Sequence, residues 1–398
     1  MAAALIGFDA AIGRLREVAR PHGREIVPLA AAAGRVLAEP VRAAIRAPAA
    51  DVSTMDGYAV RSPDVAQLPA RLAVVAQALP GSLPGAALAT GQCARIFTGA
   101  PLPPGADRVV IQEVVAREGD QAVVEGPLDE IRFVRAAGSD FEPGDVLLGA
   151  GQMLTPRALV AAAAGDIAEL TVWRRPVVSL IATGDELVQP GSARSRPGAV
   201  PDSLSEGLAA WVRQWGADLG SQARVGDDLE RLAHCAAEAA ASSDLVLVTG
   251  GASVGERDQG REMFGPDLTL LFSKVAIRPG KPVWLGRVGE ALVLGLPGNP
   301  TSAMVTVRLF LAPLLAGLCG RDPIAALAWR HAPLGDALGP TGDRETFSRG
   351  RMEGGRAWLL PNQDSGAQRS LADAELLVRR PSGVSGFAAG DLIEVLDF

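Results

Sequence analysis

The sequence predicts a multidomain α/β protein with a central parallel-sheet domain, a β-rich inserted domain, a discontinuous N-terminal helical and extended domain, and a small C-terminal β-barrel. The 398 residues suffice for two or three domains at about 150 residues each. Apolar residues make up 48% of the chain and charged residues 21%, which is typical of folded proteins. Between residues 175 and 320, apolar strand segments alternate with helical segments, which indicates a parallel sheet covered on both faces.

The first part of the chain combines a helical pattern with a β-rich insertion. Apolar residues recur at three- and four-residue intervals over 8–18 and predict a helix. After Pro48, short β-rich runs alternate with Gly and Pro turns. Thr155 and Pro156 then predict the start of an alanine-rich helix that extends to about Leu170. We therefore expect a discontinuous dimerisation domain over residues 1–47 and 145–173, with residues 48–144 inserted into it.

The central domain is expected over residues 174–321 and the C-terminal β-barrel over 322–398. Ser203 and Glu206 have the spacing of a capping box at the start of a helix, and Asp228 begins another. Asn299 is the expected N-cap of a third helix. The predicted strands are 177–182, 245–248 and 291–294 in the central domain, and 357–360, 376–378 and 392–395 in the barrel.

Composition excludes several classes of protein. Three cysteines and three histidines lie scattered, without the spacing of a zinc site or a disulfide framework. The net charge of −7 argues against a nucleic-acid partner. The uncharged apolar stretch 309–319 is too short to span a membrane, and no basic residue precedes Arg14, as a secretory signal would require. We therefore expect a cytoplasmic protein without a membrane partner.

Lysine is rare in this chain. Of the 38 arginine and lysine residues, only Lys274 and Lys281 are lysine, and both lie in the segment 273–282. A lysine ammonium is compact, whereas an arginine guanidinium is planar, so the two are not equivalent where an anion must be approached closely. The sequence therefore indicates a cationic site in this segment.

Polar residues follow three predicted strands, in the loops 183–186, 249–258 and 295–302. Ligands of open parallel sheets bind at this edge. Gly250 and Gly251 allow close approach of backbone N–H groups to a phosphate, and Ser253 adds a hydroxyl donor. Asn299 begins a helix whose free N–H groups favour an anion. Tight turns and simple helix capping are the structural alternatives for these residues.

Carboxylates lie beside the same loops and repel a phosphate unless a cation lies between them. Mg²⁺ is commonly held by one or two carboxylates together with substrate phosphate oxygens. The candidate ligands are Asp185, Glu186, Asp202 and Asp258. Solvated surface carboxylates are the alternative for each of them taken singly.

The segment Gly251–Gly255 also fits the G-x-S-x-G motif of α/β-hydrolases, with Ser253 as the nucleophile. The residues after it form a poor start for the apolar helix that this motif requires. His331 is the only downstream histidine that could act as the base. A serine hydrolase is therefore the weaker alternative.

Seven motifs in order resemble the molybdopterin molybdotransferase family, which includes the MoeA proteins and the E domain of gephyrin. The resemblance covers nearly the whole chain. The motifs are Ser53–Val60, Phe97–Pro101, Gly138–Asp145, Thr183–Leu187, Thr249–Asp258, Ile277–Pro282 and Leu296–Pro300.

This resemblance implies the insertion of molybdate into adenylylated molybdopterin with release of AMP, assisted by Mg²⁺. It also implies a homodimer whose active site is shared between chains, and the adenylylating molybdopterin-binding protein as a further partner. The implied catalytic residues are Asp56, Thr98, Asp140, Glu186, Asp202, Lys274, Arg278 and Lys281. The implied metal ligands are Asp258 and Asp202, and the implied binding residues are Thr183, Gly250, Gly251, Ser253, Pro282, Pro297, Gly298, Asn299, Ser302, Arg349 and Ser365.

Two positions depart from the family pattern. Leu204 stands where the family usually has asparagine, and Glu375 stands where asparagine is expected. The alternative to an active transferase is therefore a catalytically diverged paralogue that binds molybdopterin or serves as a scaffold.

Overall fold

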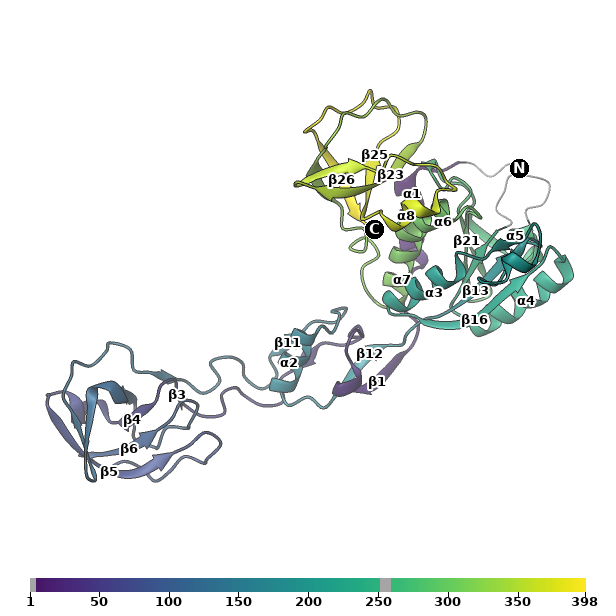
Figure 1. Ribbon diagram of the computed structural model, residues 1–398. Helices are drawn as coiled ribbons and strands as arrows, with labels where there is room; N and C mark the ends of the chain where they lie inside the picture. The colour runs from purple at the N-terminus through teal and green to yellow at the C-terminus, as the bar shows by residue number, and fades with distance from the viewer. Residues whose placement is uncertain (1–4, 251–258) are drawn as a thin grey trace.

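A computed structural model of the chain describes residues 5–250 and 259–398. Figure 1 shows an elongated molecule with a β-sheet lobe at one end, a narrow middle part, and a larger α/β body at the other end that carries the C-terminal strands. The polypeptide crosses the middle part twice, because the β-sheet lobe is an insertion between β2 and β11. The expected multidomain α/β architecture is thus confirmed.

The α/β body is built on a six-stranded sheet. The predicted strands 177–182, 245–248 and 291–294 are confirmed, and they pair in parallel with one another and with a fourth strand. Two further strands extend the sheet in antiparallel orientation. In spatial order the strands are β16 (Asp218–Val225), β13 (Val177–Thr183), β17 (Leu245–Thr249), β21 (Ala291–Leu296), β20 (Trp284–Val288) and β18 (Thr269–Phe272).

Alternate residues of these strands point to two separate cores. Leu180, Leu247 and Leu294 belong to the larger core, whereas Val246 and Val248 belong to the smaller one. This alternation follows from the two-residue period of a strand. The larger core is covered by α1 (Phe8–Val18), α3 (Ser205–Gln214) and the helix Pro300–Leu318, and the smaller by α4 (Leu229–Ser242) and α5 (Gln259–Glu262).

The predicted capping box at Ser203 is wrong. Asp202, one residue earlier, caps α3: its Oδ1 accepts hydrogen bonds from the N–H groups of Leu204 (3.3 Å) and Ser205 (3.1 Å). An ionised carboxylate is a stronger acceptor than a hydroxyl, and Arg224 holds it in place. The predicted cap at Asp228 is confirmed, because its Oδ1 accepts from the N–H of Arg231 at 3.1 Å.

The helix Pro300–Leu318 comprises α6 (Pro300–Thr306), a π-helical segment (Val307–Leu311) and α7 (Ala312–Leu318). By length and composition it is apolar enough to cross a membrane, but 94% of its apolar window is buried inside the protein. Arg308 lies in its middle and donates hydrogen bonds to the carbonyls of Asp397 (2.5 Å) and Ala326 (3.0 Å). The apolar character of this helix is therefore that of a core helix.

The C-terminal strands form the predicted barrel. β22 and β24 lie at the two ends of a continuous run of paired strands, and a bridge between Leu334 and Ala357 joins these ends. The strands are β19 (Ile277–Arg278), β22 (Arg330–Pro333), β23 (Glu345–Glu353), β24 (Arg356–Leu359), β25 (Leu376–Arg380) and β26 (Leu392–Asp397), with the short helix α8 (Gln368–Ala372) between β24 and β25.

Aromatic packing attaches the barrel to the body. The ring of Phe8 on α1 lies 5.7 Å from that of Phe310 on the core helix and 5.0 Å from that of Phe347 on β23. Such pairs stabilise by roughly 0.5–1.5 kcal/mol beyond the burial of their apolar area. The N-terminal helix therefore fixes the barrel against the helix that leaves β21.

The middle part contains two small β-ribbons and one helix. The predicted cap by Thr155 is confirmed, since its hydroxyl accepts from the N–H of Ala158 at 3.3 Å. The predicted helix end near Leu170 is wrong, because Gly165 and the positive φ of Asp166 end the helix and Leu170 lies in a strand. The elements are β1 (Arg24–Pro28) with β12 (Glu169–Trp173), β2 (Val41–Arg42) with β11 (Val146–Leu148), and α2 (Pro156–Ala164).

The distal lobe is a six-stranded sheet whose strands include the predicted runs 71–75, 95–97 and 108–112. Its largest core joins Tyr58, Leu72 and Val110, which come from three different strands. In spatial order the strands are β7 (Arg108–Ile111), β4 (Gly57–Val60), β6 (Gln92–Ile96), β5 (Ala70–Ala78), β9 (Gln121–Val124) and β8 (Val115–Glu118), and β3 (Val52–Ser53) pairs with β10 (Val134–Arg135) beside them.

Candidate active site

A pocket of about 310 Å³ opens where β13, β17 and β21 end. It lies at the carboxyl edge of the parallel strands, where open α/β sheets bind their ligands. Predicted residues from all three loops meet here: Thr183, Glu186, Asp202, Gly250, Gly298 and Asn299. We call this the strand-end pocket.

Two glycines allow the loops of the strand-end pocket to approach each other. Gly250 has a φ of +87°, and a Cβ there would lie 2.4 Å from the carbonyl oxygen of Thr183. A Cβ on Gly298 would lie only 3.6 Å from the Cα of Gly250. The floor of the pocket is therefore bare backbone, which suits close contact with a phosphate.

Asp202 lines the strand-end pocket, but its carboxylate is already engaged. It is 3% exposed and accepts hydrogen bonds from the Ser205 hydroxyl (2.6 Å) and from Nη2 of Arg224 (2.9 Å). Burial alone would raise the pKa of Asp202, but the hydrogen bonds from Ser205 and Arg224 lower it below its ordinary value. Asp202 thus orders the start of α3 and stays ionised.

Glu186 and Asp185 follow β13 but differ in position. Glu186 is exposed and lines the strand-end pocket. Asp185 does not belong to the pocket lining, and its Oδ1 accepts from the N–H of Asp227 at 3.0 Å. Of the two, Glu186 is therefore the carboxylate available to a ligand.

A second cavity of about 580 Å³ lies between the α/β body and the barrel, and we call it the cationic cavity. It contains Arg278, Lys281 and Pro282 from the segment in which the sequence places both lysines. Ser302 from α6 and Ser365 from the barrel also line it, as the sequence predicts.

Two arginines that sequence analysis missed add to this charge. Arg344 and Arg380 come from the barrel and line the cationic cavity with Arg278 and Lys281; Asp364 is a carboxylate in the same lining. Burial and the neighbouring charge of Arg278 lower the pKa of Arg380. Its buried Nε has no hydrogen-bond partner within the described part of the chain. The only signal in the sequence is the pair Arg379–Arg380 at the end of a predicted strand.

Asn299 and Ser365 connect the two sites. Asn299 lies at the N-cap position of α6, but its side chain does not cap the helix as predicted. Its Nδ2 instead donates a hydrogen bond of 3.1 Å to the Ser365 hydroxyl. Asn299 lines the strand-end pocket and Ser365 the cationic cavity, so the two cavities meet at this hydrogen bond.

Arg349 lies behind the cavity rather than in its lining. It is 1% exposed, and its guanidinium donates to the carbonyls of Asn362, Asp364 and Ala367 at 3.0–3.4 Å. In this structure the side chain therefore holds the segment 362–367 that presents Ser365. Its expected contact with an oxyanion is not part of this geometry.

Other predicted residues lie elsewhere. Lys274 is half-buried and does not belong to the lining of the cationic cavity. Pro297 is buried beneath the third loop. Leu204, which departs from the family pattern, lines the strand-end pocket and packs in the larger core. Gly251, Ser253 and Asp258 lie outside the described residues.

Asp56, Thr98 and Asp140 lie in or beside the distal lobe. Oδ1 of Asp56 accepts from the N–H of Thr98 (2.8 Å) and from its hydroxyl (2.9 Å), and these two bonds lower the pKa of Asp56. Asp140 is exposed, and its N–H donates to the carbonyl of Ala47. Figure 1 shows the strands of this lobe at the opposite end of the molecule from β13 and β21. One chain does not bring these residues to the strand-end pocket.

Comparisons with known proteins agree with this architecture. Residues 6–165 match the MoeA N-terminal region (domain I and II), residues 179–317 a probable molybdopterin binding domain, and residues 331–398 the MoeA C-terminal region (domain IV).

Relatives align over most of their length. The molybdopterin molybdenumtransferase of Synechococcus elongatus is 36% identical, over 98% of this chain and 99% of that protein. The molybdopterin molybdenumtransferase 2 of Mycobacterium tuberculosis is 35% identical, over 93% and 94%. The molybdopterin biosynthesis moeA protein from Pyrococcus horikoshii OT3 has a TM-score of 0.87 at 27% identity, over 99% of this chain and 100% of that one. This chain belongs to the MoeA family.

Proposed function

We propose that this protein is a molybdopterin molybdenumtransferase, which inserts molybdate into adenylylated molybdopterin and releases AMP. The observation that carries the proposal is the meeting of two cavities of different chemistry at the hydrogen bond between Asn299 and Ser365. The relatives named molybdopterin molybdenumtransferase support the same activity.

The strand-end pocket suits the phosphoanhydride of the substrate. Gly250 and Gly298 expose backbone there, and the N-terminus of the helix that begins at Pro300 points free N–H groups toward an anion. This helix continues to Leu318, so its dipole is that of a long helix. Glu186 adds a carboxylate at the exposed side.

The cationic cavity suits molybdate. A dianionic oxyanion beside two phosphates requires concentrated positive charge, and Arg278, Lys281, Arg344 and Arg380 supply it. Ser302 and Ser365 add hydroxyl donors. Arg380 keeps a buried Nε that has no hydrogen-bond partner within residues 5–250 and 259–398.

The chemistry rests on position and charge. The phosphoanhydride bond breaks, AMP leaves with its phosphate, and molybdate enters the freed dithiolene of molybdopterin. Lys281 and Arg278 hold the oxyanion, Asn299 and Ser365 hold the phosphate end beside it, and no protein nucleophile is required.

The direct test is release of AMP from adenylylated molybdopterin by the purified full chain, with and without molybdate. We expect release only with molybdate. Hydrolysis of a simple ester that Ser253→Ala abolishes, without any need for molybdate, would instead establish the serine hydrolase. Binding of molybdopterin without any release of AMP would indicate the diverged paralogue.

Magnesium is a further part of the proposal. Among the described residues, no three histidine, cysteine or carboxylate side chains gather into a possible metal site. Asp202 does not fit as a free ligand, because Arg224 and Ser205 occupy its carboxylate. We therefore place the metal between Asp258, substrate phosphate oxygens and Glu186. Asp258→Ala should lower activity more than Asp185→Ala, and equal losses would contradict this placement.

We further propose a homodimer with a shared active site. Asp56 and Thr98 lie in the distal lobe, far along the molecule from the strand-end pocket (Figure 1), so a second chain has to bring them there if they act in the same reaction. Mixing Asp56→Ala chains with Lys281→Ala chains should restore activity, because half of the sites in a mixed dimer carry neither change. Failure to restore activity in verified mixed dimers would contradict the shared site.

Two expectations remain proposals without a structural test. The protein is placed in the cytoplasm, where molybdopterin is adenylylated, and the adenylylating molybdopterin-binding protein is its proposed partner for delivery of the substrate. No membrane or nucleic-acid partner is proposed.

A further inference from the structure

A third cavity, of about 160 Å³, lies where the middle part joins the α/β body. Its lining includes five arginines, and within the described part of the chain it includes no carboxylate. The arginines are Arg35, Arg174, Arg175, Arg213 and Arg321. They come from the loop after β1, the start of β13, the end of α3 and the residues after α7, so different elements of the fold surround the cavity.

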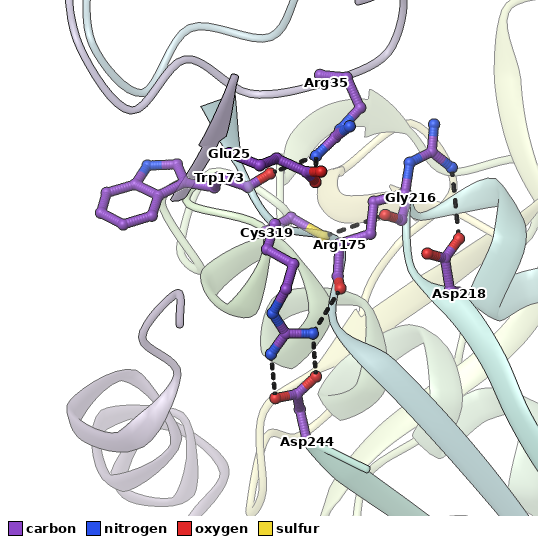
Figure 2. A network of polar contacts seen from close by, with 9 residues as sticks. Glu25, Arg35, Trp173, Arg175, Gly216, Asp218, Asp244 and Cys319 are labelled. Carbon is purple, nitrogen blue, oxygen red and sulfur yellow. Dashed lines mark hydrogen bonds and ion pairs between the residues drawn. The ribbon is translucent and has the colours of Figure 1, made fainter. Parts of the chain in front are cut away.

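Carboxylates nearby compensate only part of this charge. Figure 2 shows Glu25, Asp218 and Asp244 around the cavity, each facing an arginine. Arg174 pairs with Asp244 through two hydrogen bonds of 2.6 and 3.1 Å, and Arg35 pairs with Glu25. These two pairs leave three guanidinium groups to consider.

The remaining arginines lack a close carboxylate. Arg175 faces Asp218 at 3.8 Å, which is beyond hydrogen-bond distance. Arg321 stacks on the ring of Trp215 and donates to its carbonyl at 3.0 Å. Arg213 is exposed and has no ion pair with any residue in the ranges 5–250 and 259–398. Five positive charges thus face three negative ones in a protein whose net charge is −7.

We propose that this cavity binds a tetrahedral dianion, either a free oxyanion such as phosphate or the phosphate group of a larger molecule. An anion of two charges balances the excess, and guanidinium groups bind such oxygens in bidentate geometry. The volume is below the roughly 300 Å³ of cavities that enclose a drug-sized ligand. Because Arg35 belongs to the middle part and Arg213 to the body, the anion bridges the two.

This site is independent of the proposed transferase reaction. Its lining shares no residue with the strand-end pocket or the cationic cavity. Phosphate binding is therefore measured by calorimetry on the full chain carrying Lys281→Ala and Arg278→Ala, at constant ionic strength set with chloride, so that the cationic cavity contributes little.

The test variants are Arg213→Gln and Arg175→Gln in that background, and the matched control is Arg231→Gln, an exposed arginine on α4. We expect saturable phosphate binding that each test variant weakens roughly tenfold, the loss of about one charge-assisted hydrogen bond. The control should bind as before. Titration with AMP separates the sources: AMP binding lost in Arg213→Gln identifies a phosphate group of a larger ligand, whereas binding of inorganic phosphate alone identifies a free oxyanion.

Unchanged phosphate affinity in both Arg213→Gln and Arg175→Gln, or an equal loss in Arg231→Gln, would overturn the proposal. Far-ultraviolet circular dichroism in chloride verifies that all variants fold. Phosphate should also raise the Tm of the background protein but not that of Arg213→Gln, and an equal rise in both would count against the site.

Discussion

The side-chain amide of Asn299 donates a hydrogen bond of 3.1 Å to the hydroxyl of Ser365, across 66 residues of sequence. Asn299 begins the core helix of the α/β body, whereas Ser365 belongs to the barrel. The contact therefore sets the position of the phosphate-binding loops relative to the cationic cavity.

Breaking this contact should lower activity with little loss of stability. Asn299→Ala and Ser365→Ala each remove a part-exposed hydrogen bond, which contributes roughly 0.5–1.5 kcal/mol. A double-mutant cycle on kcat/KM for molybdate-dependent AMP release measures the coupling. We expect the double variant to be no worse than the more damaging single variant, and fully additive losses would show that the two residues act separately.

Replacing Arg349 should loosen the segment 362–367. Arg349→Met leaves three buried carbonyls without their charged donor, so we expect a loss of unfolding free energy of at least ~1–3 kcal/mol. Urea denaturation measures this loss. The control is Arg351→Met on the same strand, whose exposed guanidinium pairs with Glu353 and should matter little.

A matched loss in Arg351→Met would contradict this role for Arg349. Cleavage by a protease within 362–367 gives a second readout: Arg349→Met should be cut faster there, while its molybdate KM rises.

Asp202 should make stability depend on acid pH. Its pKa is lowered in the folded protein, so the stabilisation it gives is present above its ordinary value of 3.8 and is lost as pH falls through the lower folded pKa. Asp202→Asn should therefore be less stable than the parent protein at pH 7, and the difference should shrink in acid below about pH 4. Urea denaturation across this pH range checks it, with exposed Asp218→Asn as the control. A constant difference across the range would contradict the assigned ionisation.

Gly250 should not tolerate a side chain. Gly250→Ala combines a φ of +87° with a Cβ 2.4 Å from the Thr183 carbonyl oxygen, so the loop has to move. We expect a loss of stability of more than ~1 kcal/mol, together with a large loss of activity. Gly289→Ala is the control, because its φ is +56° and its Cβ would meet open space. Equal stability losses in both variants would mean that only the backbone conformation matters at Gly250.

The sequence predicts most of the α/β body because its elements carry local signals. Apolar runs mark β13, β17 and β21, and Asp228 marks the start of α4. Local signals fail where a neighbour in space decides. Asp202 replaces Ser203 as the cap of α3 because Arg224 on β16 holds it. The strand around Leu170 forms because β1 pairs with it.

The site is predictable only in part, for the same reason. The loop glycines and Lys281 are visible in the sequence because their motifs are local. Arg344 and Arg380 become part of the cationic cavity only when the barrel closes, and the side chain of Asn299 turns from its helix to Ser365 because the barrel lies beside it. No spacing in the sequence encodes these long-range contacts.

The two lysines test the central claim most directly, because only Lys281 lines the cationic cavity. The measurement is the KM for molybdate in AMP release from adenylylated molybdopterin, compared for Lys281→Ala and Lys274→Ala. We predict that Lys281→Ala raises this KM at least ~10-fold, the loss of a charge-assisted contact, and that Lys274→Ala raises it much less. An unchanged molybdate KM in Lys281→Ala would contradict the claim that this cavity holds molybdate beside the phosphoanhydride.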